Sequence, residues 1–318
     1  MPKLAIVIVS WNVRDLLRRC LHTLDESLAG SGMPYITIVV DNASADGSPE
    51  MLRSAFPQVR LLEPGANLGF AGGNNHALRL LLAESDAPEY ILLLNPDTEP
   101  QADAIPCLLR ALQSRPHLAA IGPQLRYPDG SLQSSRRRFP TRATFFWEST
   151  PLDRAWPANP WAQHYRLDDR SPAVAQPADW LMGAALLLRT EAIRRAGLLD
   201  ERFFMYSEEL EWQRRIQNAW SDPVQPTAIG YLPAAVVVHH EGKSSERAPA
   251  DRHSNFQRSR ILLARMWYGW RFAAWVRQFY RACYAYELAL EALKLILGHR
   301  PALRRERIAI YRRVIENL

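Results

Sequence analysis

The stretch "EYILLLNPDTEP", residues 89–100, joins an apolar run directly to a polar turn. Tyr90, Ile91 and three leucines follow one another without polar alternation, which is typical of a strand buried on both faces. Asn95 and Asp97 come immediately afterwards, on either side of a proline. Because ligands of open α/β sheets bind beyond the carboxyl ends of the strands, this ending predicts a parallel sheet with a ligand at its edge.

The same pattern recurs through the first 125 residues. Apolar runs ("KLAIVIV", "YITIVVD", "VRLLE", "LAAIGPQL") alternate with amphipathic segments of helical length ("VRDLLRRCLHTLDESL", "SPEMLRSAF", "AGGNNHALRLLLAE", "ADAIPCLLRALQ"). Strands that alternate with helices are typical of a sheet covered by helices on its faces. We therefore predict an α/β fold with a mostly parallel sheet and flanking helices.

Residues 126–178 lose this periodicity and are rich in Pro, Trp, Arg and Ser, so we expect a long irregular excursion there. Order returns with "DWLMGAALLLRTEAIRRAG" (residues 179–197) as a strand followed by a helix. The segment "AIGYLPAAVVVHH" (residues 228–240) reads as a late strand.

Composition indicates a globular, intracellular protein with a basic tail. Of 318 residues 47% are apolar, which is enough for a proper core. The three cysteines are far apart in the sequence, which favours reduced thiols and a cytoplasmic location. Residues 251–318 hold 14 basic and 5 acidic side chains, a net charge of +9, whereas the whole chain carries +6. We expect one domain over residues 1–250 and a helical extension over residues 251–318.

Two segments could supply metal ligands. Asp97, at a strand end, is suited to Mg²⁺ or Mn²⁺, which need only one or two protein oxygens when a substrate diphosphate supplies the rest. A turn residue after Pro96 is the alternative. "VVVHHEGKSS" delivers His239 and His240 to another strand end, and a histidine ligand would favour Mn²⁺, although a hydrogen-bonded structural histidine is the commoner case.

Acidic and basic clusters offer further candidates. Glu208, Glu209 and Glu211 open an amphipathic helix, where acids either complement the helix dipole or provide a general base. "RRR" at residues 136–138 is either a solvated face or a phosphate contact. The glycines of "GANLGFAGGNN" (residues 65–75) lack the spacing of a dinucleotide fingerprint and instead favour the close approach of a ligand to the backbone.

Taken in order, seven motifs strongly resemble glycosyltransferase family 2, and within it the rhamnosyltransferase-like subgroup that builds bacterial surface polysaccharides. The motifs are "VSWNVRDLLRRCLHTL", "VVDNASADGS", "NLGFAGGNN", "LLLNPDT", "GSLQSSRRRFPT", "MGAALLLRTEAIRRAGLLDERFFMYSEELEW" and "VVVHHEGKSS". The resemblance covers about residues 3 to 260. It implies a GT-A (Rossmann-like) fold, an inverting mechanism and a nucleoside diphosphate sugar donor.

The resemblance also implies a role for particular residues. Asp97 and His239 would bind Mg²⁺ or Mn²⁺, with His240 as the fallback, and Glu209 would be the catalytic base, with Glu208 as the alternative because the family usually has Asp at this position. Contacts to the donor nucleotide are expected from Ser10, Asn12, Asp41, Asn67, Gly72, Asn95 and Arg137.

We therefore expect a transferase that moves a sugar, rhamnose from dTDP-rhamnose in the leading hypothesis, to a glycan or glycolipid acceptor. A UDP-hexose or furanose donor is the alternative within enzymes, and a nucleotide-sugar-binding partner without catalysis is the alternative outside them.

In "YELALEALKLIL", Glu287, Glu291 and Lys294 share one narrow helical stripe, which favours an interfacial helix on the inner face of the cell membrane. Oligomerisation or domain packing is the other interpretation of that helix. No recognised nucleic-acid-binding module accompanies the basic tail, so we expect no nucleic acid partner.

Overall fold

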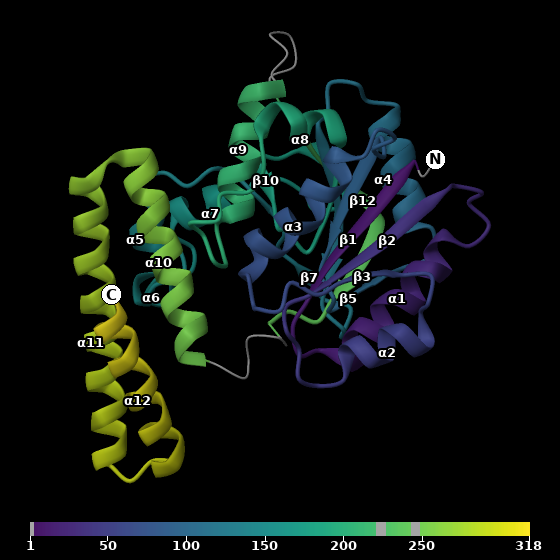
Figure 1. The fold of residues 1–318 in the computed structure, drawn as a ribbon. Coiled ribbons are helices and arrows are strands. Elements are labelled where there is room, and N and C mark those ends of the chain that lie inside the picture. Colours follow the sequence, from purple (N-terminus) through teal and green to yellow (C-terminus); the bar gives the residue numbers. More distant parts are fainter. Residues whose placement is uncertain (1–2, 221–226, 243–248) are drawn as a thin grey trace. The chain divides into compact units, whose positions relative to one another are not determined.

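A computed structural model describes residues 3–220, 227–242 and 249–318 (Figure 1). Contacts between Cα atoms divide the chain into two compact units. Residues 1–139, 169–204 and 208–244 form the first unit, and residues 140–168, 205–207 and 245–318 form the second. Residues 140–168 of the expected excursion thus share a unit with the C-terminal residues, whereas residues 126–139 and 169–178 belong to the first unit.

The first unit is built on a ten-stranded sheet in which the strand order is β3-β2-β1-β4-β11-β6-β12-β5, with β7 paired to β6 and β9 to β12. The strands are β1 (Leu4–Ser10), β2 (Tyr35–Asp41), β3 (Arg60–Leu62), β4 (Tyr90–Leu94), β5 (Thr98–Pro100), β6 (Ala120–Arg126), β7 (Leu132–Gln133), β9 (Gln176–Pro177), β11 (Ala185–Arg189) and β12 (Ile229–His239). A second, two-stranded sheet pairs β8 (Arg136–Arg137) with β10 (Trp180–Leu181).

The pairing explains why polar residues gather at one edge. Strands β3, β2, β1 and β4 run parallel to one another, and β6 runs parallel to β12, whereas β11 is antiparallel to both β4 and β6. The register pairs Ser10 with Asp41 and Ile8 with Leu94. The ends of β1, β2 and β4 therefore lie at one level, and the predicted mostly parallel sheet is confirmed.

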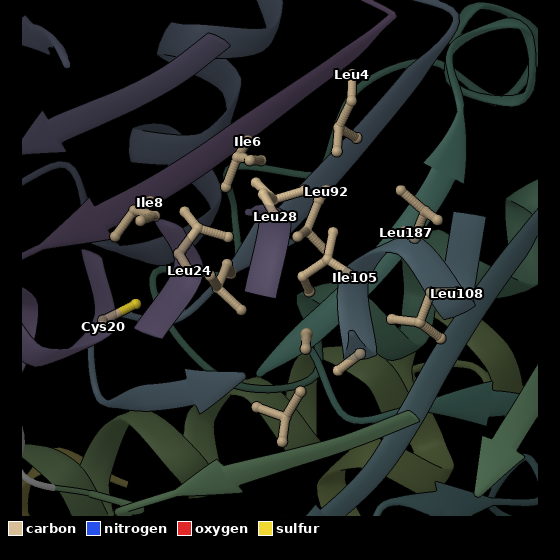
Figure 2. Close-up of a cluster of buried hydrophobic side chains, with 14 of the residues drawn as sticks. Leu4, Ile6, Ile8, Cys20, Leu24, Leu28, Leu92, Ile105, Leu108 and Leu187 are labelled. Atoms are coloured by element: carbon tan, nitrogen blue, oxygen red, sulfur yellow. The ribbon is translucent and has the colours of Figure 1, made fainter. Parts of the chain in front are cut away.

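The helices of the first unit are α1 (Arg14–Leu28), α2 (Ser48–Ala55), α3 (Gly69–Ala83), α4 (Ala104–Gln113), α8 (Thr190–Ala196) and α9 (Glu208–Trp220). Leu4, Ile6 and Ile8 of β1 face Leu24 of α1 and Ile105 of α4 in a single core (Figure 2). Burial of these branched side chains stabilises the fold by about 1.5–3 kcal/mol each.

The other face of β1 receives α3 at unusually close range. A Cβ atom at Gly73 would lie 2.6 Å from Cγ1 of Val9. Only a residue without a side chain allows this approach. Both faces of β1 are therefore covered, which is why the strand has no polar alternation.

The second unit contains the helices α5 (Thr144–Trp147), α6 (Pro151–Ala155), α7 (Pro160–Arg166), α10 (Pro249–Tyr268), α11 (Trp270–Ile296) and α12 (Pro301–Asn317). The expectation of an irregular excursion over 126–178 was wrong in part, because three short helices and the strands β7, β8 and β9 form there. Helices of four to seven residues are too short to show a helical period in the sequence. Among the described residues, no helix has the length and apolar character needed to span a membrane.

Arg260 of α10 holds the second unit together. Its side chain is 8% exposed and contacts the Glu148 carboxylate at 2.6 Å, and its guanidinium lies over the rings of Phe145, Phe256 and Tyr280. Such a buried ion pair keeps its charges because each is matched and hydrogen-bonded.

Candidate functional site

The ends of β1 and β2 form a hydrogen-bonded loop pair. The Asn42 amide donates to the Ser10 carbonyl at 2.8 Å, and the Ser44 amide donates to Asp41 Oδ2 at 2.8 Å. The Asn12 side chain accepts from the Ala45 amide at 2.7 Å. The structure thus brings together Ser10, Asn12 and Asp41, which the family resemblance implied as contacts to the donor nucleotide.

Three buried oxygens in this loop pair make no hydrogen bond within the part of the chain that the structure describes. They are Ser10 Oγ, Asp41 Oδ1 and Asn42 Oδ1, on side chains that are no more than 2% exposed. A buried polar atom without a partner costs about 1–3 kcal/mol. Three adjacent ones point to a polar ligand that would satisfy them.

The N-terminus of α3 adjoins this loop pair. Asn42 Nδ2 donates to the Gly69 carbonyl at 3.0 Å, and the Gly69 amide donates to Asn67 Oδ1 at 2.9 Å. Gly69 has a φ of +71°, and a Cβ there would lie 2.2 Å from the Phe204 carbonyl oxygen. Asn67 therefore shapes the turn into α3, and Gly72 is buried one turn beyond.

Asp97 and His239 meet at the ends of β4 and β12. His239 Nε2 lies 3.4 Å from Asp97 Oδ1, and the two residues are 4% and 5% exposed. The backbone fixes the pair, because the His240 amide donates to the Asp97 carbonyl at 2.9 Å and β5 pairs with β12 through Thr98 and His239.

The neighbouring histidine is engaged elsewhere. His240 Nε2 lies 2.8 Å from Glu99 Oε1, and Arg19 approaches the same carboxylate at 3.5 Å. The geometry therefore favours His239 over His240 as a ligand on the Asp97 side.

The donor set suits a divalent cation that shares its coordination with a substrate. Two cis ligands at about 2.1–2.2 Å from one octahedral ion lie roughly 3 Å apart, close to the separation of Asp97 Oδ1 and His239 Nε2. Among the described residues, no cluster of three His, Cys, Asp or Glu side chains could hold a metal alone. Ser244 and Ser245, part of the motif that introduced His239, lie outside the described residues.

The acidic cluster opens α9 after two residues with left-handed backbone. Tyr206 and Ser207 have φ values of 72° and 68°, a conformation that costs non-glycine residues of order 1–3 kcal/mol and that concentrates at functional sites. Arg215 Nε donates to both carboxylate oxygens of Glu211, at 2.9 and 3.0 Å, so Glu211 has a structural role in α9. Glu208 is 3% exposed and Glu209 is partly exposed.

Gly183 links Glu209 to the sheet edge. A Cβ atom at Gly183 would lie 3.4 Å from both Cβ and Cγ of Glu209. The Asn95 amide donates to the carbonyl of the next residue, Ala184, at 2.8 Å. Asn95 and Glu209 therefore flank one two-residue segment, and this contact favours Glu209 over Glu208 as the group that reaches the edge.

Arg137 occupies the two-stranded sheet beside this segment. It pairs in register with Trp180, and its guanidinium donates to Ser134 Oγ at 2.6 Å. The neighbouring arginines bond within the protein, since Arg136 donates to the Arg170 carbonyl and Arg138 forms two hydrogen bonds to Asp169. The bidentate bond to Arg138 lowers the pKa of Asp169 to about 2.

Cys20 lies beneath the turn that carries Asp97. Its Sγ is 3.5 Å from the Asn95 carbonyl and 3.7 Å from Thr98 Oγ1. Complete burial raises the pKa of this thiol to about 12. The thiol is therefore a neutral packing group and no nucleophile at neutral pH.

A cavity of about 410 Å³ lies at the opposite end of the sheet, where β6 and β12 begin. Its lining includes Leu118, Ile121 and Gly230. None of the candidate residues lines it, so its volume says nothing about the site.

Sequence reasoning missed Gly183 and Gln133 as individual residues. Both stand inside motifs that carried the family resemblance, "MGAALLL" and "GSLQSSRRR". Their partners, Glu209 and His239, are 26 and 106 residues further along the chain. A glycine beside a strand and a glutamine in a two-residue strand have no local pattern that could have singled them out.

Solved structures define the class to which this fold belongs. The mannosyltransferase PcManGT from Pyrobaculum calidifontis, in complex with GDP-Man and Mn²⁺, aligns over 99% of this chain and 86% of its own, with a TM-score of 0.53 and 16% identity. At this identity the likeness concerns the fold alone. The fold is the GT-A fold of glycosyltransferases.

Sequence comparison narrows the class to a family. The model of the family described as "Glycosyl transferase family 2" matches residues 5–173. The chain is 34% identical, over 274 residues, to the N-acetylglucosaminyl-diphospho-decaprenol L-rhamnosyltransferase of Mycobacterium tuberculosis, covering 84% of this chain and 86% of that protein. The chain belongs to glycosyltransferase family 2 and is a glycosyltransferase.

A more distant relative comes from an archaeon. The low-salt glycan biosynthesis hexosyltransferase Agl10 of Haloferax volcanii is 29% identical over 215 residues, which is 68% of this chain and 62% of that protein. The resemblance to rhamnosyltransferases of glycan biosynthesis expected from the motifs is confirmed, and so is the expectation of an enzyme.

Proposed function

We propose that the protein is an inverting, metal-dependent rhamnosyltransferase that moves rhamnose from dTDP-rhamnose to a hydroxyl of a lipid-linked glycan. The observation that carries this proposal is the segment Gly183–Ala184, which is bonded to Asn95 beside the Asp97 turn and packed against Glu209. It joins a candidate diphosphate site to a candidate base. The name of the mycobacterial relative supports the sugar and the type of acceptor.

The donor nucleotide would bind at the ends of β1 and β2. The unsatisfied oxygens of Ser10, Asp41 and Asn42 are acceptors that suit the N–H of a base or the hydroxyls of a ribose. Asn12 and Asn67 shape the adjoining loops, and the start of α3 near Gly72 provides backbone N–H groups that favour a phosphate.

Asp97 and His239 would hold Mg²⁺ or Mn²⁺ together with the donor diphosphate. Such an ion stabilises the negative charge that develops on the leaving diphosphate. Asn95, a neutral neighbour of this pair, would orient the sugar phosphate without adding charge. Arg137 would add a planar cation to the same diphosphate, the role for which its fork geometry suits it.

Glu209 would act on the acceptor. The acceptor oxygen attacks the anomeric carbon from the face opposite the diphosphate, the new C–O bond forms, and the bond to the diphosphate oxygen breaks with its electron pair. The acceptor proton passes to the Glu209 carboxylate. Transfer of this kind inverts the anomeric centre, and a positioned carboxylate base contributes typically 10²–10⁴-fold to the rate.

Helices α11 and α12 would rest on an anionic membrane surface, which a lipid-linked acceptor requires. The acidic residues of α11 face inward, because Glu291 is 1% exposed and bonded to Arg304 and Lys294, and Glu287 is bonded to Arg154. Trp275 and Ile296, by contrast, are 74% and 82% exposed.

This arrangement leaves an apolar surface edged with arginine. A hollow of about 450 Å³ lies between α11 and α12 and is lined by Leu288, Ala292, Leu295, Ile296, Arg305, Ile308, Ala309 and Arg312. Exposed apolar and aromatic side chains beside cations are typical of interfacial helices. We therefore retain the assignment of residues 1–250 to catalysis and 251–318 to an extension on the inner face of the membrane, with a second copy of the chain as the alternative partner.

A thermal-shift comparison of nucleoside diphosphates, each with Mn²⁺ and with Mg²⁺, tests the donor. A ligand that binds the native state at 100 times its Kd stabilises it by about 2.7 kcal/mol. We expect dTDP to raise Tm more than UDP or GDP. A larger shift with UDP would instead favour the alternative of a UDP-hexose or furanose donor, and no shift with any of the three would contradict the proposed nucleotide site.

A further inference from the structure

A chain of hydrogen bonds leads from the metal-facing histidine to the protein surface. His239 Nδ1 lies 2.9 Å from Gln133 Oε1. Gln133 Nε2 donates to Glu241 Oε2 at 2.9 Å, and the Tyr127 hydroxyl lies 3.0 Å from the same carboxylate oxygen. Gln133 is 2% exposed on β7, whereas Glu241 is exposed.

The hydrogen bonds that join His239, Gln133 and Glu241 can be arranged, from donor to acceptor, in only one direction. An ionised carboxylate accepts hydrogen bonds and donates none, so the Gln133 amide must turn its N–H₂ group toward Glu241 and its oxygen toward His239. Burial, and after it the Glu241 carboxylate, raise the pKa of Tyr127, which keeps the hydroxyl protonated as a second donor. His239 Nδ1 must then carry a hydrogen to donate to Gln133.

We propose that Gln133 is a positioning residue that holds His239 in its Nδ1–H tautomer and leaves the Nε2 lone pair directed at the Asp97 side. The inference rests on the proposed metal site, because Nε2 is the atom that lies 3.4 Å from Asp97 Oδ1. Partners of this kind fix the orientation of metal-binding histidines, and their loss typically weakens metal affinity 10–100-fold.

The backbone around Glu241 is consistent with a constrained contact. Glu241, the second residue after the end of β12, has a φ of 23°, an uncommon value for a residue with a side chain. Gln133 is held in register opposite Leu125 on β6. Both ends of the Gln133–Glu241 bond are thus placed by backbone structure.

The first test measures Mn²⁺ binding to the full chain in the presence of dTDP, by the loss of the free-ion signal in electron paramagnetic resonance. Gln133→Leu removes the acceptor and is expected to raise the Kd for Mn²⁺ about 10–100-fold. Glu241→Ala, at an exposed position, leaves the amide free to flip and should cause a smaller rise. Gln124→Leu is the matched control, a buried glutamine on β6 that bonds to Tyr231 instead, and should leave the Kd unchanged.

The second test reads the tautomer directly and needs no metal. Nitrogen-15 NMR of the His239 ring should show Nδ1 protonated in the wild-type chain, and a shift toward the Nε2–H tautomer in Gln133→Leu. A wild-type ring protonated at Nε2 alone would overturn the inference. So would an unchanged tautomer together with an unchanged Kd for Mn²⁺ in Gln133→Leu.

A charge exchange separates this role from general packing. In the double variant Gln133→Glu, Glu241→Gln, a carboxylate accepts from His239 Nδ1–H and the new amide donates to that carboxylate. We expect it to regain Mn²⁺ binding relative to Gln133→Leu, and failure to do so with an unchanged Tm would contradict the inference. If the wild-type protein instead showed the expected tautomer but bound no Mn²⁺ with any nucleoside diphosphate, the result would contradict the proposed metal site, and with it the role of Gln133 in metal binding.

Discussion

The backbone amide of Asn95 donates a hydrogen bond of 2.8 Å to the carbonyl of Ala184. This bond ties the end of β4, which carries Asp97 two residues further on, to the segment that enters β11. Gly183 precedes Ala184 and lies against Glu209, so the candidate metal ligand and the candidate base share one rigid support. A base and a leaving-group site must keep a fixed separation for catalysis, and a misplacement of 1 Å can cost 10²-fold in rate.

Enlarging Gly183 tests this support. A methyl group there reaches ordinary contact at 3.4 Å from Glu209, so Gly183→Ala should keep near wild-type activity. Gly183→Val adds methyl groups that displace the Glu209 side chain, and we expect kcat to fall about tenfold or more with little change in the donor KM. Steady-state kinetics on the two variants measures the difference. Equal kcat values for valine and alanine would show that Glu209 does not depend on this contact.

Among the glycines of α3 that have ordinary backbone angles, we expect Gly73 to lose the most stability when it is replaced by alanine. Its Cβ would lie 2.6 Å from Val9 Cγ1, so Gly73→Ala must push α3 away from β1. Such overpacking costs typically about 1–3 kcal/mol. Urea unfolding measures the loss, with Gly183→Ala as the control, because Gly183 has no left-handed backbone angle and its new methyl group would reach ordinary contact at 3.4 Å. A Gly73→Ala chain as stable as the wild type would contradict the close packing.

Cys20 makes stability fall at alkaline pH. Its pKa is raised to about 12 in the folded chain, whereas an unfolded thiol has a pKa of about 8.5. Below pH 8.5 both states are protonated and this contribution to stability is fully present, and it is lost as pH rises from about 8.5 toward 12. Cys20→Ala should therefore flatten the decline of Tm over this range. If the wild type and the variant lost stability in parallel, the burial of Cys20 would not be its cause.

The apolar face of α11 predicts binding to anionic vesicles. Leu293 and Ile296 are 53% and 82% exposed, so Leu293→Glu with Ile296→Glu should leave the fold intact and abolish cosedimentation with phosphatidylglycerol vesicles. Glu316→Gln, an exposed change on α12, is the control. If the double variant bound the vesicles as well as the wild type, this face would not be the membrane contact. If the double change instead altered the sedimentation velocity of the protein without vesicles, the face would be a dimer interface.

The strands and their polar ends could be predicted because they are local. "YITIVVD" is the whole of β2 and ends in Asp41, and "YILLLNPDT" contains β4 and the turn that carries Asp97, so both aspartates could be assigned to the sheet edge from the sequence. The direction of β11 could not, because an antiparallel neighbour of β4 is set by pairing over almost a hundred residues. The inward orientation of Glu291 likewise depends on Arg304, on another helix. These features depend on contacts between residues that are far apart in the sequence, so local propensity could not predict them.

Transfer of rhamnose from dTDP-rhamnose to a lipid-linked N-acetylglucosamine diphosphate, measured with Mn²⁺ by mass spectrometry of the product, tests the central claim most directly. We expect product and dTDP in equal amounts from the wild-type chain, a rate lower by about 10²–10⁴-fold for Glu209→Gln, and near wild-type transfer for Glu208→Gln. A Glu209→Gln chain that transfers rhamnose at the wild-type rate, or a wild-type chain that releases no nucleoside diphosphate from any donor with metal present, would contradict it.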